Sequence, residues 1–147
     1  MKQDGTKYKL QPEILKYMKD ISKIYGVKLK FEENRLGGVF YGDTIVVGLK
    51  SSSRSGIISI FCHELGHYIL WQNGKYSKYH NPKYFGKIQK QFQHYGQLVR
   101  YCLNAEIATE RKGKELCKEW FPKVKYKVYY KDTKLCYEFL YGYYFRG

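Results

Sequence analysis

The sequence predicts an α+β domain in which a small three-stranded sheet packs against helices. Apolar residues first recur at helical spacing, then alternate with charged residues as in strands, and later return to helical spacing. The chain has 147 residues, of which 44% are hydrophobic and 27% charged, as in a folded domain rather than a disordered segment. We therefore expect a single domain over residues 1–147, with a core over 12–122 and a basic, Tyr-rich extension over 123–147.

The first helix is expected over residues 12–25, because apolar side chains recur there every three or four positions. Pro12 suits a first helical turn and Gly26 suits the end of a helix. Three short strands follow, marked by alternation or by β-branched residues, with a turn at Gly42-Asp43 between the second and third. They are expected over residues 27–32, 37–41 and 44–49.

The second half of the chain is predicted to be mainly helical. A buried helix follows a serine-rich loop and ends at Asn73-Gly74, and Gly96 is a candidate break between two later helices. After these helices the pattern changes to strict alternation, which is typical of a strand or hairpin with one lysine-rich face. The helices are expected over residues 56–71, 83–94 and 97–120, and the strand over 123–130.

Charge and cysteine usage restrict the class of protein. Lys and Arg number 27 against 13 Asp and Glu, which gives a net charge of +14. The cysteines lie far apart without a Cys-x-x-Cys pair, which excludes a zinc ribbon and argues against a disulfide scaffold. No signal peptide or membrane-spanning run is apparent. We expect a cytoplasmic protein with reduced thiols and no membrane association. The four cysteines are Cys62, Cys102, Cys117 and Cys136.

The segment that carries chemistry is the HELGH run at residues 63–67. Helical residues four apart lie on one face, so His63 and His67 can present two imidazoles to one ion. Glu64 is rotated about a quarter turn from His63, so its carboxylate can reach a water held by the ion without coordinating the ion itself. A zinc hydrolase requires such a pair of ligands, a third protein ligand, an open position and a nearby base. We therefore expect Zn²⁺ as cofactor and Glu64 as the catalytic base.

Chance is a poor explanation of this motif. A bare His-Glu-x-x-His run is expected by accident in roughly 0.6% of chains with this His and Glu content. The neighbouring residues are apolar or uncharged, and a buried helix otherwise has no use for two histidines and a glutamate. The alternative is a histidine pair that is solvated or held by hydrogen bonds alone.

A third ligand must come from another segment, because the extended HExxHxxGxxH pattern is absent. Glu106 is the first candidate, since it would lie on an otherwise apolar or small-residue face of the last helix, where a carboxylate needs a partner. His80, shortly after the HExxH helix, is the second. Glu110 and His94 are the remaining alternatives, and Glu110 could instead support a ligand by hydrogen bonding.

The run from Gly26 to Tyr68 resembles compact zinc metallopeptidases of the gluzincin type, in particular the ImmA/IrrE-like proteins of phages and mobile elements. The matching segments are 37–41, 44–47 and 63–68. Downstream, the run from Ala105 to Leu116 resembles that family's Glu-x-x-Ala helix, whose glutamate is the third zinc ligand, although Thr109 stands where the family usually has Ala.

The resemblance implies a metallopeptidase that hydrolyses a peptide bond in a protein substrate. His63, His67 and Glu106 would be the metal ligands and Glu64 the general base. A DNA-binding repressor is a candidate substrate.

Two alternatives remain for the function. The stretch from His80 to Phe85 also resembles the third-histidine segment of SprT-like proteases, which act on proteins attached to DNA, and His80 would then be the third ligand. The other is a non-catalytic phage-type binding or inhibitor protein that keeps the metal as a structural site. A structural site needs no base beside its first ligand, so Glu64 favours catalysis.

The basic region is a candidate for weak nucleic-acid contact. Between Arg111 and Lys134 basic residues outnumber acidic ones and tyrosines are interleaved. Such a surface could follow a phosphate backbone and stack on bases. The plainer alternative is a solvated strand face that discourages aggregation.

The expected reaction is metal-assisted peptide hydrolysis, with Glu64 moving a proton from water to the leaving amine. If strand 44–49 lies at the sheet edge, an extended peptide could pair with it. The oxyanion needs a further donor, and the sequence offers several without choosing between them. They are Tyr76, Tyr79, His80 and His94.

Overall fold

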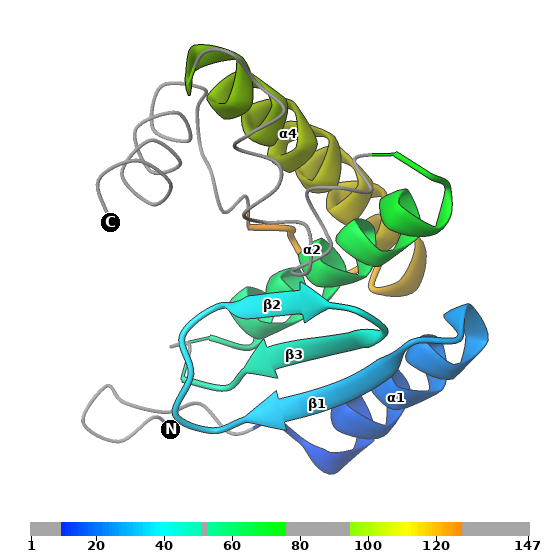
Figure 1. The fold of residues 1–147 in the computed structure, drawn as a ribbon. Helices are drawn as coiled ribbons and strands as arrows, with labels where there is room; N and C mark the ends of the chain where they lie inside the picture. Colours follow the sequence, from blue (N-terminus) through cyan, green and yellow to red (C-terminus); the bar gives the residue numbers. More distant parts are fainter. Residues whose placement is uncertain (1–9, 51–52, 76–94, 128–147) are drawn as a thin grey trace.

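The computed structural model describes residues 10–50, 53–75 and 95–127 (Figure 1). Its helices and strands confirm the α+β class. In chain order they are α1 (Pro12–Tyr25), β1 (Lys28–Glu32), β2 (Gly38–Tyr41), β3 (Thr44–Gly48), α2 (Arg54–Gln72) and α4 (Tyr95–Trp120). The helix expected over 83–94 lies outside the described residues.

Helix α1 has the bounds that its terminal residues predict. Gly26 adopts φ 79°, in the left-handed region, and its N–H donates to the carbonyl of Lys23 at 3.1 Å. The N–H of Val27 donates to the carbonyl of Ser22 at 3.0 Å, which completes a common helix-ending motif. Glycine takes this conformation without steric cost, so the helix ends there.

The sheet has the strand order β1-β3-β2. Strand β1 pairs in parallel with β3, and β2 pairs with β3 in an antiparallel hairpin whose turn is Gly42-Asp43. Gly42 has φ 60°, as tight hairpin turns require. The expectation that strand 44–49 lies at the sheet edge is therefore wrong, because β1 pairs with one side of β3 and β2 with the other. In the described sheet, β1 and β2 are the edge strands.

Helices α1 and α2 cover the same face of the sheet. In Figure 1, α1 lies behind β1 and α2 behind β2. Ile45 and Val47 of β3 point into this helical layer and join one apolar core with Met18 of α1 and Phe61 of α2. On the opposite face, Lys30 is exposed, whereas its neighbour Val46 on the central strand is 1% exposed.

Helix α2 is buried around most of its circumference because the sheet and α4 both pack against it. It begins after Ser53, whose hydroxyl accepts a hydrogen bond from the N–H of Gly56 at 3.1 Å. It ends at Asn73, and Gly74 follows with φ 76°. The buried helix and its end are as the sequence predicts. No helix in the described part of the chain is both long and apolar enough to cross a membrane.

Helix α4 begins at Tyr95, so Gly96 lies in its first turn rather than before it. The expected helix before Gly96 falls outside the described residues. The C-terminal end of α4 packs on α1, where the rings of Tyr17 and Phe121 lie edge to face with centroids 5.2 Å apart. The Tyr17 hydroxyl also donates to the carbonyl of Trp120 at 2.7 Å.

The strand expected from residue 123 is not formed over 123–127, which are turn and irregular backbone. The alternation that predicted it is nevertheless real. Val124 and Tyr126 are half-buried against the helices, whereas the lysines between and around them are exposed. The segment packs its apolar side on α2 and α4 rather than pairing with the described sheet. The rest of the predicted strand or hairpin lies outside the described residues.

Gly48 provides a test of how residues 33–37 pack on β3. A Cβ at Gly48 would lie 2.2 Å from the carbonyl oxygen of Arg35 and 2.4 Å from that of Gly37. We expect Gly48→Ala to lower the free energy of unfolding by about 1–3 kcal/mol, because backbone would have to move. Urea denaturation would measure this, with the exposed Lys30→Ala as control. An unchanged midpoint for Gly48→Ala would contradict the packing of residues 33–37 on β3.

Candidate metal centre

The site depends on a close approach of α2 and α4. A Cβ at Gly66, within the HELGH run, would lie 3.0 Å from the carbonyl oxygen of Thr109 and 3.3 Å from the backbone nitrogen of Gly113. A Cβ at Gly113 would lie 3.2 Å from the Cα of His63. Because both glycines lack side chains, the two backbones come close enough for short α4 side chains to reach the histidines of α2.

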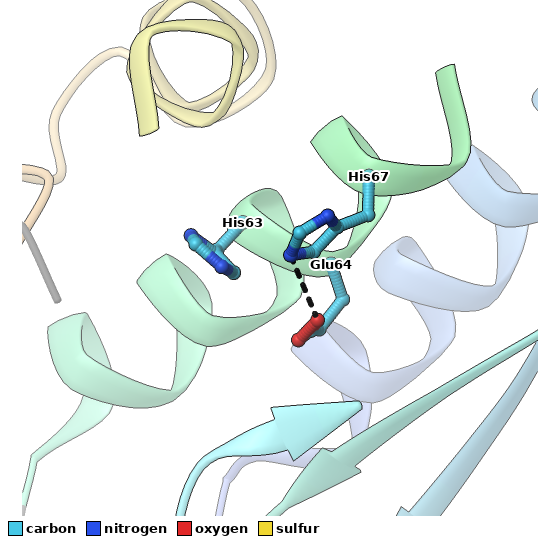
Figure 2. A group of neighbouring side chains, drawn as sticks. All are labelled: His63, Glu64 and His67. Atoms are coloured by element: carbon cyan, nitrogen blue, oxygen red, sulfur yellow. Dashed lines mark ion pairs between the residues drawn. The ribbon is translucent and has the colours of Figure 1, made fainter. Parts of the chain in front are cut away.

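His63, Glu64 and His67 form a cluster that could hold a metal ion. Their potential ligand atoms lie within 4.8 Å of one another. Figure 2 shows the two imidazoles on successive turns of α2 and the carboxylate of Glu64 beside His67, on the side of the sheet. A Glu64 oxygen lies 3.9 Å from Nε2 of His67. Glu64 is 4% exposed and His67 6%, whereas the side chain of His63 is 12% exposed.

Helix α4 adds Glu106 to this cluster. One of its carboxylate oxygens lies 3.3 Å from Nε2 of His63 and the other 3.4 Å from Nε2 of His67. Glu106 thus offers one oxygen to each imidazole. Imidazole and carboxylate are both donor types that zinc accepts.

Hydrogen bonds from α4 orient both imidazoles. Nδ1 of His63 lies 2.6 Å from a carboxylate oxygen of Glu110. Nδ1 of His67 lies 3.1 Å from the hydroxyl of Thr109, which itself donates to the carbonyl of Ala105 at 2.7 Å. Both histidines can therefore donate from Nδ1–H, which leaves Nε2 of each ring facing Glu106, where it can hold either a proton or a metal ion. Metal-binding histidines are commonly held in this way.

The electrostatics of the cluster favour a cation. Burial opposes the charged form of His63, but Glu106 and Glu110 outweigh it and raise its pKa well above the usual range. Burial alone would raise the pKa of Glu106, yet the neighbouring His67 and His63 hold it well below its ordinary value. Burial raises the pKa of Glu64. Buried carboxylates beside neutral imidazoles require positive charge, which protons or a metal ion can supply.

The structure thus brings together four of the residues singled out in the sequence. Glu110, an alternative ligand, instead contacts the Nδ1 side of His63. Neither His80 nor His94 is among the described residues, and the same holds for the other candidate oxyanion donors, Tyr76 and Tyr79.

Sequence reasoning missed two supporting residues. Thr109 lies three positions after Glu106 and bonds His67, and its only sequence signal was that it replaces the alanine usual in the resembled family. Tyr126 donates from its hydroxyl to Glu110 at 2.6 Å. The alternation after residue 122 placed Tyr126 on the inward side but did not identify its partner.

Two buried cysteines lie near the site. Cys62 and Cys117 are free and buried. A hydrogen bond between them raises the pKa of Cys62, with burial as a further cause, and lowers that of Cys117. The side chains of Cys102 and Cys136 are outside the described part.

The chain was also compared with known proteins. No family model, curated protein or solved structure matches it. The case that this cluster could hold a metal ion therefore rests on the residues themselves: their donor types, burial and hydrogen bonds.

Proposed function

We propose that the protein is a zinc-dependent metallopeptidase of the gluzincin type. His63, His67 and Glu106 would hold the metal and Glu64 would act as the catalytic base. The observation that carries this proposal is the buried carboxylate of Glu64, 3.9 Å from Nε2 of His67 and on the same helix as both imidazoles. A purely structural metal site gains nothing from such a carboxylate.

The roles of the residues follow from their chemistry. Zinc, when bound, lowers the pKa of a coordinated water toward neutrality and polarises a peptide carbonyl. Glu64 accepts a proton from the attacking water and passes it to the leaving amine. Burial raises the pKa of Glu64, which suits a group that must hold this proton before releasing it.

Strand β2 is the part of the sheet best placed to bind substrate. A Cβ at Gly38 would lie 2.9 Å from Cγ of Glu64, so this strand passes directly beside the catalytic base. Because β2 is an edge strand of the described sheet, an extended peptide could pair with it and present a peptide bond to Glu64. We therefore expect β2, rather than strand 44–49, to pair with an extended substrate peptide.

The position of Glu106 favours a gluzincin over an SprT-like protease. In the SprT-like alternative His80 replaces Glu106 as the third ligand, and Glu106 would then lie within 3.4 Å of both imidazoles without a role. An ImmA/IrrE-like peptidase acting on a DNA-binding repressor remains the most specific version of the proposal. Contact with nucleic acid through the basic region stays a prediction.

The ligand set can be tested by metal binding. We expect Glu106→Ala to weaken zinc binding by at least about 100-fold, because even residues that only support ligands commonly contribute 10–100-fold. The matched control is Glu115→Ala, an exposed carboxylate on the same helix. Competition with a fluorescent zinc chelator would measure both affinities. Retained affinity in Glu106→Ala together with loss in His80→Ala would instead support the SprT-like alternative.

The catalytic role can be tested by separating activity from metal binding. We expect Glu64→Gln to bind zinc within a few-fold of wild type but to lower kcat/KM about 10²–10⁴-fold, the usual contribution of a general base. Cleavage of a mixed-sequence peptide library, followed by mass spectrometry, provides the assay, and the exposed Glu13→Gln is the control. If Glu64→Gln cleaved the library as fast as wild type, Glu64 would not be the base.

A further inference from the structure

The segment from Phe121 to Lys127 reaches back to the metal centre through Tyr126. The Tyr126 hydroxyl donates to a Glu110 oxygen at 2.6 Å, and the same oxygen lies 2.6 Å from Nδ1 of His63. Two donors from different parts of the chain therefore converge on one carboxylate oxygen. Burial, and then the charge of Glu110, raise the pKa of Tyr126, so its hydroxyl keeps its proton to donate.

The backbone on both sides of Tyr126 is anchored. On one side the carbonyl of Val124 accepts from the thiol of Cys117 on α4 at 3.6 Å. On the other, the N–H of Lys127 donates to the hydroxyl oxygen of Ser59 at 2.8 Å. Ser59 lies one turn before His63 on α2 and donates its own proton to the carbonyl of Ser55. The segment thus bridges the two helices that carry the candidate ligands.

The sequence of α4 also leaves space for this tyrosine. A Cβ at Gly113 would lie 2.6 Å from the Tyr126 hydroxyl oxygen and 3.1 Å from Cζ. Any other residue at position 113 would therefore displace the ring from Glu110 or push α4 away from His63. Gly113 thus leaves room for the Tyr126 hydroxyl, and Glu110 accepts its hydrogen bond.

We propose that Tyr126 is a positioning residue of the metal centre: its hydroxyl fixes the Glu110 carboxylate that orients His63. This inference rests on the proposed metal site but assigns a role to a residue outside its ligands and its base. It makes the segment after α4 a determinant of metal affinity, although none of that segment's side chains coordinates the metal. The residue touches neither substrate nor reacting atoms, so it acts only through Glu110.

The test is Tyr126→Phe in the full-length protein, which removes only the hydroxyl. We expect zinc affinity to fall about 3–10-fold, less than the 10–100-fold typical of residues that contact a ligand directly. The absorption bands of bound Co²⁺ should also shift, since they report ligand orientation. The matched control is Tyr17→Phe, which loses a comparable hydroxyl bond to Trp120 and should change neither readout.

A double substitution tests the route of the effect. In a Glu110→Ala background, which removes the shared acceptor, Tyr126→Phe should cause little further loss of zinc affinity, because the tyrosine acts through that carboxylate. The proposal would be overturned if the two losses multiplied, or if Tyr126→Phe bound zinc like wild type.

A measurement without metal separates this inference from the proposed function. The ¹⁵N resonances of the His63 ring in metal-free protein should move in Tyr126→Phe and stay fixed in Tyr17→Phe. If wild type bound no zinc but the His63 resonances moved, the metallopeptidase proposal would fail while the coupling would stand. Unmoved His63 resonances in Tyr126→Phe would refute the coupling itself.

Discussion

Carboxylates and imidazoles are concentrated between α2 and α4, and the rest of the site is arranged around them. Glu64 and Glu106 are nearly inaccessible to water, and they face two histidines whose Nδ1 atoms are already engaged on α4. Such a cluster is costly to bury unless a proton or cation lies among its acceptors. Its residues could hold a metal ion, and imidazole and carboxylate are donors that zinc accepts. Two other features serve this cluster: Gly66 permits the two helices to approach, and the edge strand β2 passes beside Glu64.

Local patterns predicted the parts of this arrangement that depend on local geometry. The HELGH spacing predicted two imidazoles on one face of a helix, and the small-residue face of the last helix predicted Glu106. The central position of β3 was not predictable in this way, because it depends on the pairing of β3 with β1, a strand that is distant in sequence. The strand expected from residue 123 is not formed over 123–127 for a related reason. Alternation indicates which side of a segment is buried, and here helices cover that side.

The supporting residues were harder to predict because their partners are set by how two helices cross. In the sequence, Thr109 is an ordinary small polar residue of a helix. Only the packing of α2 on α4 places His67 beside its hydroxyl. Tyr126 is one tyrosine among 17, and its role depends on the path of an irregular segment across both helices. These contacts nevertheless select which nitrogen of each histidine is available to a ligand. The ligand residues can thus be proposed from sequence, whereas their orientation could be described only once the fold was known.

X-ray absorption at the zinc edge, on protein loaded with an equimolar amount of zinc, would show whether His63 and His67 bind the metal. Coordination by these residues and Glu106 predicts nitrogen and oxygen scatterers at about 2.0–2.1 Å, with the multiple-scattering signature of two imidazoles. A sulfur shell at about 2.3 Å would instead indicate that a buried thiol such as Cys62 binds the metal. That result, or the signature of fewer than two imidazoles, would rule out the proposed ligand set.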